Sequence, residues 1–450
     1  MTVESTSVRE ELFGPTHRPV TVGIVLLVSL IAFEAMGVGT AMPALVADLG
    51  TVSSYAWPFV AFIATNVIGT VLGGRWCDTR GPRAMLLGAP VLFGVGLVVA
   101  GTAGTMAQLL LGRVLQGLGA GAVTVAVYVL IAQVYSPRAR PGVFALLASA
   151  WVVPSLVGPP VSGVVTDTFS WHWVFLGLVP LVVLAVLLLL PAGRGLTAPS
   201  VVPPVRTGLV AAAFAAAGGV AALSWAGQRL TPAAFVTALV ALAVLVPAIR
   251  RLVPPGTFTA RPGIAAVVAA RGLLAGSFFT MSAYLPLMLT ETHSWSLSAA
   301  GSPLIVGSLA WSLASAWQGR RPDLPRPRLL LWGFLGVALG VAGLLLVAPT
   351  WGIAWLALPT TALAGLGMGI GYPAISFMLL QESGAGEIGF NSSSANLADQ
   401  LAQAVFVGVG GTLLALLSPP AAALTVLLVV LVGLALLGAA LSARTAPTLP

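Results

Sequence analysis

Four ionisable residues lie deep inside long apolar stretches of the sequence: Glu34, Arg113, Arg271 and Asp399. The chain is 58% hydrophobic and only 7% charged, so most other charges fall in short polar connections. A charge held away from water is costly, and such residues commonly mark a proton, ion or substrate path. A carboxyl group can exchange a proton, and an arginine nearby can balance its charge. These four residues are therefore the first candidates for chemistry.

The apolar character of the whole chain limits the elements that can position these residues. Mean hydropathy is +1.03 over 450 residues, whereas soluble domains carry about a quarter of their residues charged. A helix crosses the hydrocarbon with about 20 apolar residues, and the short alternating strands of a membrane barrel are absent from the sequence. We therefore predict an all-α, multi-pass membrane protein.

Fourteen apolar segments are long enough to cross a membrane, two of them between two sets of six. The segment at 208–227 is rich in alanine and glycine and could instead lie at the membrane interface. The predicted segments are 20–46, 55–75, 84–103, 106–135, 140–166, 172–191, 208–227, 232–249, 263–289, 295–318, 328–348, 352–381, 388–416 and 419–442.

This count predicts two six-helix bundles with pseudo-two-fold symmetry and two inserted central helices. The expected divisions are an N-terminal segment 1–19, a bundle 20–191, a linker with the two extra helices 192–262, a second bundle 263–442 and a tail 443–450. The first apolar segment shows no cleavage pattern, so we expect it to be retained.

The distribution of arginine predicts the orientation in the membrane. With the N-terminus inside, 17 of the 20 basic residues fall in cytoplasmic segments, and the sequence has no lysine. We therefore expect both termini in the cytoplasm, and the lysine-free composition favours a bacterial plasma membrane. The net charge of +8 reflects this topology, and we expect no nucleic acid partner. The inner arginines are 9, 18, 75, 80, 83, 138, 140, 194, 206, 250, 251, 261, 320, 321, 326, 328 and 444.

Metal, cofactor and enzyme chemistry have little support in the sequence. Cys77 is the only cysteine, and His17, His172 and His293 fall in three separate connections. The loops are too short for a soluble catalytic domain, and no nucleotide-binding Gly-x-x-x-x-Gly-Lys pattern occurs. We expect no metal, cofactor or enzyme activity.

The sequence repeats itself across its two halves. Gly74 matches Gly319 at an offset of 245 residues, and Arg75, Asp78, Pro82 and Arg83 recur with it. The stretch that begins at Gln116, QGLGAG, recurs as AGLGMG from Ala364, at an offset of 248. Duplicated bundles around a midplane site are the design of secondary transporters.

The repeated loop resembles a motif of the major facilitator superfamily, and the chain resembles in particular its fourteen-helix drug:proton antiporter branch. The motif residues are Gly74, Asp78, Gly81 and Arg83. The resemblance implies that they latch neighbouring helix ends in the outward-open state. Thr79 and Pro82 stand where the family usually has arginines, which weakens the implied latch.

Two further motifs resemble the same family. Arg113 and Gln116 are similar to a fourth-helix motif whose buried arginine is implicated in proton coupling. The run from Pro154 to Gly163, which includes Gly158 and Pro159, is similar to a fifth-helix motif associated with antiporters. Proline and glycine there also favour a kinked, closely packed helix. The aromatic run 171–175 resembles a pattern of the fourteen-helix branch and would also suit the membrane interface.

Glu34 and Arg113 fall at similar depth, each about 20 Å from the inner face at 1.5 Å per residue. We therefore predict an ion pair, direct or through water. At the repeat offsets Glu34 matches Ser277 and Arg113 matches Thr361, so only the first half carries these charges. We hypothesise that Glu34 exchanges a proton for substrate; the alternative is a permanently paired, structural salt bridge.

A polar stripe on the thirteenth segment is formed by Asn396, Asp399 and Gln403, with Ser392 one turn before them. It could serve as hydrogen-bonding contact between helices or as a substrate or proton path, and Asp399 is the second proton candidate. Arg271 could extend toward the interface or pair with Asp399; we favour the first, because long basic side chains often do so.

Together these features predict a proton-driven exporter of amphipathic or hydrophobic small molecules, acting as a monomer by alternating access. Resemblance implies multidrug efflux. Alternatives are export of one endogenous metabolite or lipid, proton-coupled uptake, and a transport-inactive sensor or scaffold.

Overall fold

The computed structural model describes residues 8–15, 17–136, 138–192, 196, 208–321, 323–383 and 387–445. These residues are predominantly helical, and none of them forms a β-strand. The described helices include 14 that are long and apolar enough to cross a membrane, which confirms the predicted count. Parts of the predicted N-terminal segment, linker and tail lie outside the described residues, namely 1–7, 193–195, 197–207 and 446–450; these include Arg194 and Arg206.

The first half of the chain forms one bundle in which α3 and α4 pack on α5, and α2 packs on α6. The helices α7 and α8 together make one membrane-length segment. The elements are α1 (Val8–Phe13), α2 (Arg18–Leu49), η1 (Val52–Ser54), α3 (Trp57–Arg80), α4 (Arg83–Gly101), α5 (Met106–Val134), α6 (Arg140–Thr168), α7 (His172–Leu176) and α8 (Val179–Leu189).

The second half repeats this packing: α13 and α14 pack on α15, and α11 packs on α16. Here α12 and α13 together form one membrane-length segment. The elements are η3 (Thr257–Thr259), α11 (Ile264–His293), α12 (Leu297–Ala300), α13 (Ser302–Gly319), α14 (Arg326–Gly343), η4 (Leu344–Leu346), η5 (Ala354–Leu356), α15 (Ala357–Glu382), α16 (Ile388–Leu416), α17 (Pro420–Leu441) and η6 (Ser442–Thr445).

Glycines of the repeated QGLGAG and AGLGMG stretches lie at close contacts between helices in both halves. A Cβ at Gly121 on α5 would lie 2.2 Å from the carbonyl oxygen of Asn66 on α3. Its repeat partner Gly369 on α15 would meet the carbonyl of Trp311 on α13 at 2.3 Å. Helices that touch backbone to backbone require glycine at the contact. The two halves therefore use the same contact at matching positions.

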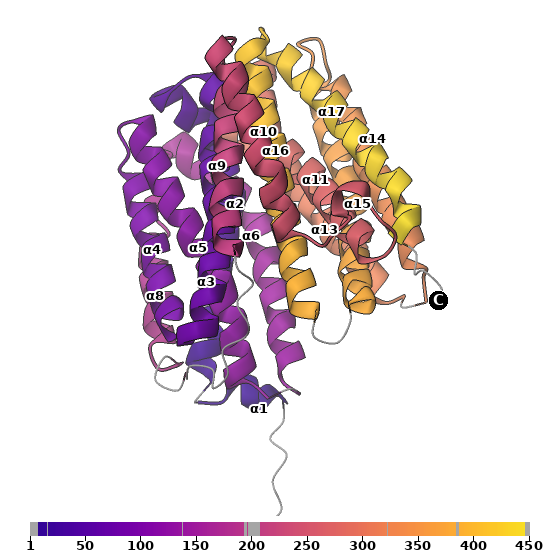
Figure 1. Ribbon diagram of the computed structural model, residues 1–450. Helices are drawn as coiled ribbons and strands as arrows, with labels where there is room; N and C mark the ends of the chain where they lie inside the picture. Colours follow the sequence, from indigo (N-terminus) through magenta and orange to yellow (C-terminus); the bar gives the residue numbers. More distant parts are fainter. Residues whose placement is uncertain are drawn as a thin grey trace, which may run out of the picture.

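The two central helices, α9 (Leu209–Gly227) and α10 (Pro232–Leu252), form a hairpin. α9 packs against both α3 and α16, while α10 packs mainly on α9. Figure 1 shows the hairpin in front of the boundary between the purple helices of the first half and the orange helices of the second. Because α9 has membrane-crossing length and apolarity, this packing favours a crossing helix over an interfacial one.

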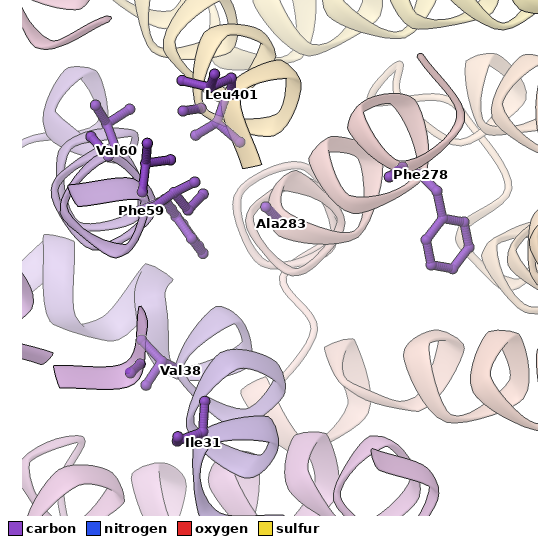
Figure 2. Packing of buried hydrophobic residues seen from close by; sticks show 14 of the residues in the cluster. Ile31, Val38, Phe59, Val60, Phe278, Ala283 and Leu401 are labelled. Atoms are coloured by element: carbon purple, nitrogen blue, oxygen red, sulfur yellow. The ribbon is translucent and has the colours of Figure 1, made fainter. Parts of the chain in front are cut away.

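The halves meet at the end of the bundle opposite α1 and the end of α17, which we call the closed face. The terminal face is the end that carries α1 and the end of α17 (Figure 1). At the closed face Tyr55 donates a hydrogen bond to the Ala283 carbonyl, and Asp167 accepts one from the Ser298 amide. Apolar side chains of both halves continue this contact inward, and Figure 2 shows Phe59 of α3 facing the helix that carries Ala283.

The short helix α1 packs on the terminal face of the first bundle. The carboxylate of Glu11 accepts hydrogen bonds from the Ser136 amide at 2.6 Å and the Ser136 hydroxyl at 2.8 Å. These bonds, the amide first, hold the pKa of Glu11 below its ordinary value of 4.5. The hydroxyl of Thr21 links the carbonyl of Leu12 to the hydroxyl of Tyr135. Hydrogen bonds therefore hold α1 against the end of α5.

Candidate functional site

The side chains of Glu34 and Arg113 form a buried ion pair inside the first bundle. Glu34 on α2 is fully buried, and the Arg113 side chain on α5 is 3% exposed. Nη1 of Arg113 donates to Oε1 of Glu34. The similar depth of the two residues predicted an ion pair, direct or through water, and the structure shows a direct one.

Arg113 also holds two acceptors besides Glu34. Its Nε donates to the carbonyl of Pro58 on α3 at 3.1 Å, and its Nη1 donates to Oε1 of Gln116 at 2.6 Å. Its guanidinium lies over the ring of Phe62, 4.4 Å from the centroid. The arginine is therefore held from three sides by groups that carry no net charge.

Two polar atoms of this site have no hydrogen-bond partner among the described residues. They are Oε2 of Glu34 and Nε2 of Gln116, both inaccessible to solvent. Buried polar atoms are normally paired, so each unpaired one marks a place of potential rearrangement or of an ordered water. One carboxylate oxygen of Glu34 thus accepts a hydrogen bond from Arg113, and the other is buried without a partner among the described residues.

The second half has neutral residues at the corresponding positions. Ser277 and Thr361 are 0% and 1% exposed, and their hydroxyls have no partner in the described part of the chain. Thr361 packs instead against Gly307 of α13. The charged pair is therefore specific to the first half, although the surrounding helices repeat.

Arg271 and Asp399 form a second ion pair, in the other bundle. Nε of Arg271 on α11 lies 3.0 and 2.9 Å from the two carboxylate oxygens of Asp399 on α16. The expectation that Arg271 extends toward the interface is therefore wrong. Helix periodicity shows which residues share a face, but not which residue of a neighbouring helix lies opposite, and here an acceptor is within reach.

Residues of α15 complete this second cluster, and sequence reasoning missed them. The Tyr372 hydroxyl donates to Asp399 at 2.9 Å, and Arg271 donates to Ser376 at 3.0 Å and to Asn396 at 3.3 Å. Arg271 also bonds to the Tyr372 hydroxyl and lies over the Tyr372 ring. The sequence did carry one signal for them: Tyr372 and Ser376 are polar residues four apart, and they therefore share a face of the apolar helix α15.

Only part of the predicted polar stripe on α16 belongs to this cluster. Asn396 and Asp399 belong to it, whereas Gln403 lies one turn further along α16, half-buried and outside the cluster. Ser392 also lies outside it, half-buried one turn before Asn396. The stripe is therefore a contact between α16, α11 and α15 over its middle part.

The loop motif lies at the terminal face. Gly81 ends α3 with φ +80°, a conformation that favours glycine, and Gly74 lies near Val125 of α5. Asp78 and Arg83 are exposed, and Asp78 makes no hydrogen bond or ion pair within the described residues. The contact that the resemblance implies for Asp78 is thus not formed in this structure.

The fifth-helix motif lies on α6, and its glycines contact α2 of the first half and α12 of the second half. A Cβ at Gly158 would lie 3.5 Å from Met36 on α2, and one at Gly163 only 2.6 Å from Ser298 on α12. The Pro159 carbonyl faces Gly301, and Pro154 is buried one turn earlier. The motif therefore provides close helix contact on both sides of the boundary.

No group of three or more His, Cys, Asp or Glu residues among those described could share a metal ion.

Comparison with known proteins agrees with this architecture. The family model of the Major Facilitator Superfamily matches residues 24–407. A major-facilitator-type transporter of Mycobacterium tuberculosis is 32% identical over 219 residues, which cover 48% of this chain and 32% of that protein. Multidrug resistance protein 3 of Bacillus subtilis is 31% identical over 36% of this chain and 32% of its own length. The matched segments thus span about a third of these relatives.

Solved structures share the fold at low sequence identity. A POT family transporter in complex with 5-aminolevulinic acid superposes with a TM-score of 0.71 and 15% identity, over 96% of this chain and 98% of that one. A D-xylose–proton symporter gives a TM-score of 0.69 and 16% identity, over 95% and 98%. Both cover nearly the whole chain, including its two halves.

Proposed function

The chain belongs to the major facilitator superfamily, and from this we propose that it is a proton-coupled exporter of amphipathic or hydrophobic small molecules. We place it in the fourteen-helix drug:proton antiporter branch. The 14 membrane-length helices support this assignment, as do the antiporter-like motif on α6 and relatives named as multidrug proteins. We propose that it acts as a monomer in a bacterial plasma membrane.

We assign the terminal face to the cytoplasm, because the arginine-rich connections lie there. The closed face is then the outer one, and the structure corresponds to an inward-facing state. The unengaged Asp78 agrees with this assignment, since the resemblance places its latch in the outward-open state.

The buried pair of Glu34 and Arg113 is the observation that carries the proton-coupling proposal. A proton that reaches Glu34 cancels its charge and removes the attraction to Arg113. The guanidinium then keeps the Pro58 carbonyl and the Gln116 amide oxygen as acceptors, so it is not stranded in an apolar medium. Proton uptake can therefore separate α2 from α5 locally and favour the other state of the bundle.

The cluster around Asp399 is the second candidate for proton exchange. Arg271 and Tyr372 both donate to this carboxylate, and the two helices of the pair lie in the bundle that lacks a counterpart of Glu34. A transporter that uses both sites would carry one proton in each half.

The proposal is tested with the purified chain in proteoliposomes. An imposed pH gradient should drive accumulation of amphipathic dyes against their concentration gradient, and collapse of the gradient should abolish it. Counterflow without a gradient should persist. An antiporter would be contradicted by accumulation that does not depend on the gradient, or by accumulation in the same direction as proton flow. Absence of counterflow for every such compound would also contradict it.

A further inference from the structure

Three consecutive residues at the start of α3 contact α11, α16 and the residue that follows α9. These residues, Tyr55, Ala56 and Trp57, form what we call the outer tripeptide. The hydroxyl of Tyr55 donates to the backbone carbonyl of Ala283 on α11 at 2.7 Å. The Tyr55 side chain is fully buried, and its ring lies 5.2 Å from that of Tyr284. A hydrogen bond of a fully buried side chain therefore joins the two halves.

The next residue meets α16 at a contact that only glycine permits. A Cβ built at Gly411 would lie 2.4 Å from the Cβ of Ala56, closer than real side chains approach. Ala56 is itself fully buried. Any larger residue at position 411 would have to push α3 and α16 apart at the outer face.

The third residue binds the central hairpin. Nε1 of Trp57 donates to Oε1 of Gln228, which follows α9, at 3.0 Å. The end of α9 also packs on α16, because a Cβ at Gly227 would lie 2.3 Å from the hydroxyl of Thr412. The end of α9 thus lies against both α3 and α16 at their boundary.

We propose that the outer tripeptide, together with the end of α9, closes the outer end of the transport path and sets the equilibrium between its closed and open states. This inference rests on the alternating access of the proposed function. When the outer ends separate, the bond from Tyr55 to Ala283 and the contact of Ala56 with Gly411 must both break. Each is a small, separable contribution, so single substitutions shift the equilibrium without destroying the fold.

A matched pair of tyrosine substitutions tests the closure. Tyr55→Phe removes the hydroxyl that crosses between halves and keeps the ring. Tyr284→Phe removes an equally buried hydroxyl whose bond, to the Val407 carbonyl at 2.6 Å, stays within the second half. Both variants leave a backbone carbonyl that still accepts its helical hydrogen bond, so their costs to folding should be similar.

The reporter is a cysteine at Thr40, a fully buried residue that packs on Gly301 across the boundary. It is introduced with Cys77→Ala, since Cys77 is the only native cysteine. A membrane-impermeant maleimide is applied to sealed vesicles of either orientation, without substrate or pH gradient. Tyr55→Phe should raise the outer-face labelling rate about two- to tenfold, as loss of one hydrogen bond implies, and Tyr284→Phe should leave it unchanged.

A second pair makes the test independent of the hydrogen bond. Gly411→Ala should also raise labelling, whereas Gly433→Ala on α17, where a Cβ meets no atom within 4 Å, should not. Equal labelling of the parent, Tyr55→Phe and Gly411→Ala would overturn the proposal, and so would equal acceleration by the two tyrosine variants. The readout needs neither proton coupling nor a known substrate, so it stands apart from the exporter assay. Labelling from the opposite vesicle orientation would identify a reversed topology instead.

Discussion

Glu34 and Arg113, 79 residues apart in the sequence, form an ion pair whose side chains are 0% and 3% exposed. The pair joins α2 to α5 at a depth where water is scarce. The two partners are bonded unequally: Arg113 also donates to the Pro58 carbonyl and to Gln116, whereas the second carboxylate oxygen of Glu34 accepts no hydrogen bond from the described residues. Loss of charge on Glu34 is therefore tolerated better than loss of Arg113.

The first prediction concerns that inequality. Arg113→Ala leaves a buried carboxylate without a counter-charge and should lower the free energy of unfolding by about 3–5 kcal/mol. Glu34→Gln should cost much less, because the guanidinium keeps its two neutral acceptors. Denaturation in mixed micelles measures both. A larger loss for Glu34→Gln than for Arg113→Ala would show that the two partners have been assigned the wrong roles.

The second prediction concerns Asp399. Tyr372→Phe removes one donor and should destabilise the second half by about 1 kcal/mol, while Asp399→Ala leaves Arg271 buried without a counter-charge and should cost several times more. The double variant Asp399→Asn with Arg271→Gln should recover most of that loss. If the double variant is no more stable than Asp399→Ala, Arg271 and Asp399 do not act as a pair.

The third prediction concerns the repeated glycines. Gly121→Ala and Gly369→Ala each place a methyl group against a facing carbonyl and should cost about 1–3 kcal/mol through forced helix separation. Gly88→Ala on α4 is the matched control, because a Cβ there meets no atom within 4 Å. Thermal unfolding in detergent distinguishes them, and equal behaviour of all three would contradict the backbone contacts.

The sequence predicted the number of helices, their duplication and the partner of Glu34. Each of these depends on quantities that a sequence carries directly: the length of an apolar run, the offset of a repeat, and depth counted along a helix. The sequence named Asp399 as a possible partner of Arg271 but did not decide between that pair and extension toward the interface. That choice depends on how α11 and α16 are rotated about their axes, which is set by packing with α15 and α17 rather than by either helix alone.

Tyr55 illustrates the same limit at the outer boundary. A tyrosine near the start of a membrane helix is common at the lipid interface, so its type and position suggested nothing further. Only the fold shows that its hydroxyl reaches a carbonyl of the opposite half. Likewise, the apolar segment at 208–227 showed no sign of lying across the boundary between the halves.

The fourth prediction is a pH dependence of the terminal face. The pKa of Glu11 is lowered in the folded protein, so its bonds to Ser136 stabilise α1 fully above about pH 4.5, its unfolded value, and are lost as pH falls through the lower folded value. The protection factors of the Val8–Phe13 amides, which are corrected for the intrinsic slowing of exchange in acid, should therefore fall on acidification. Glu11→Gln should have low protection factors already at pH 7, and these should respond little to acid. A parent-like pH response in that variant would assign the effect to another group.

The central claim is that Glu34 carries the exchanged proton, and the most direct measurement compares the parent with Glu34→Gln in proteoliposomes. The account predicts that the variant still performs substrate counterflow but no longer accumulates substrate when a pH gradient is imposed. Accumulation by Glu34→Gln with the parent's dependence on the gradient would contradict it.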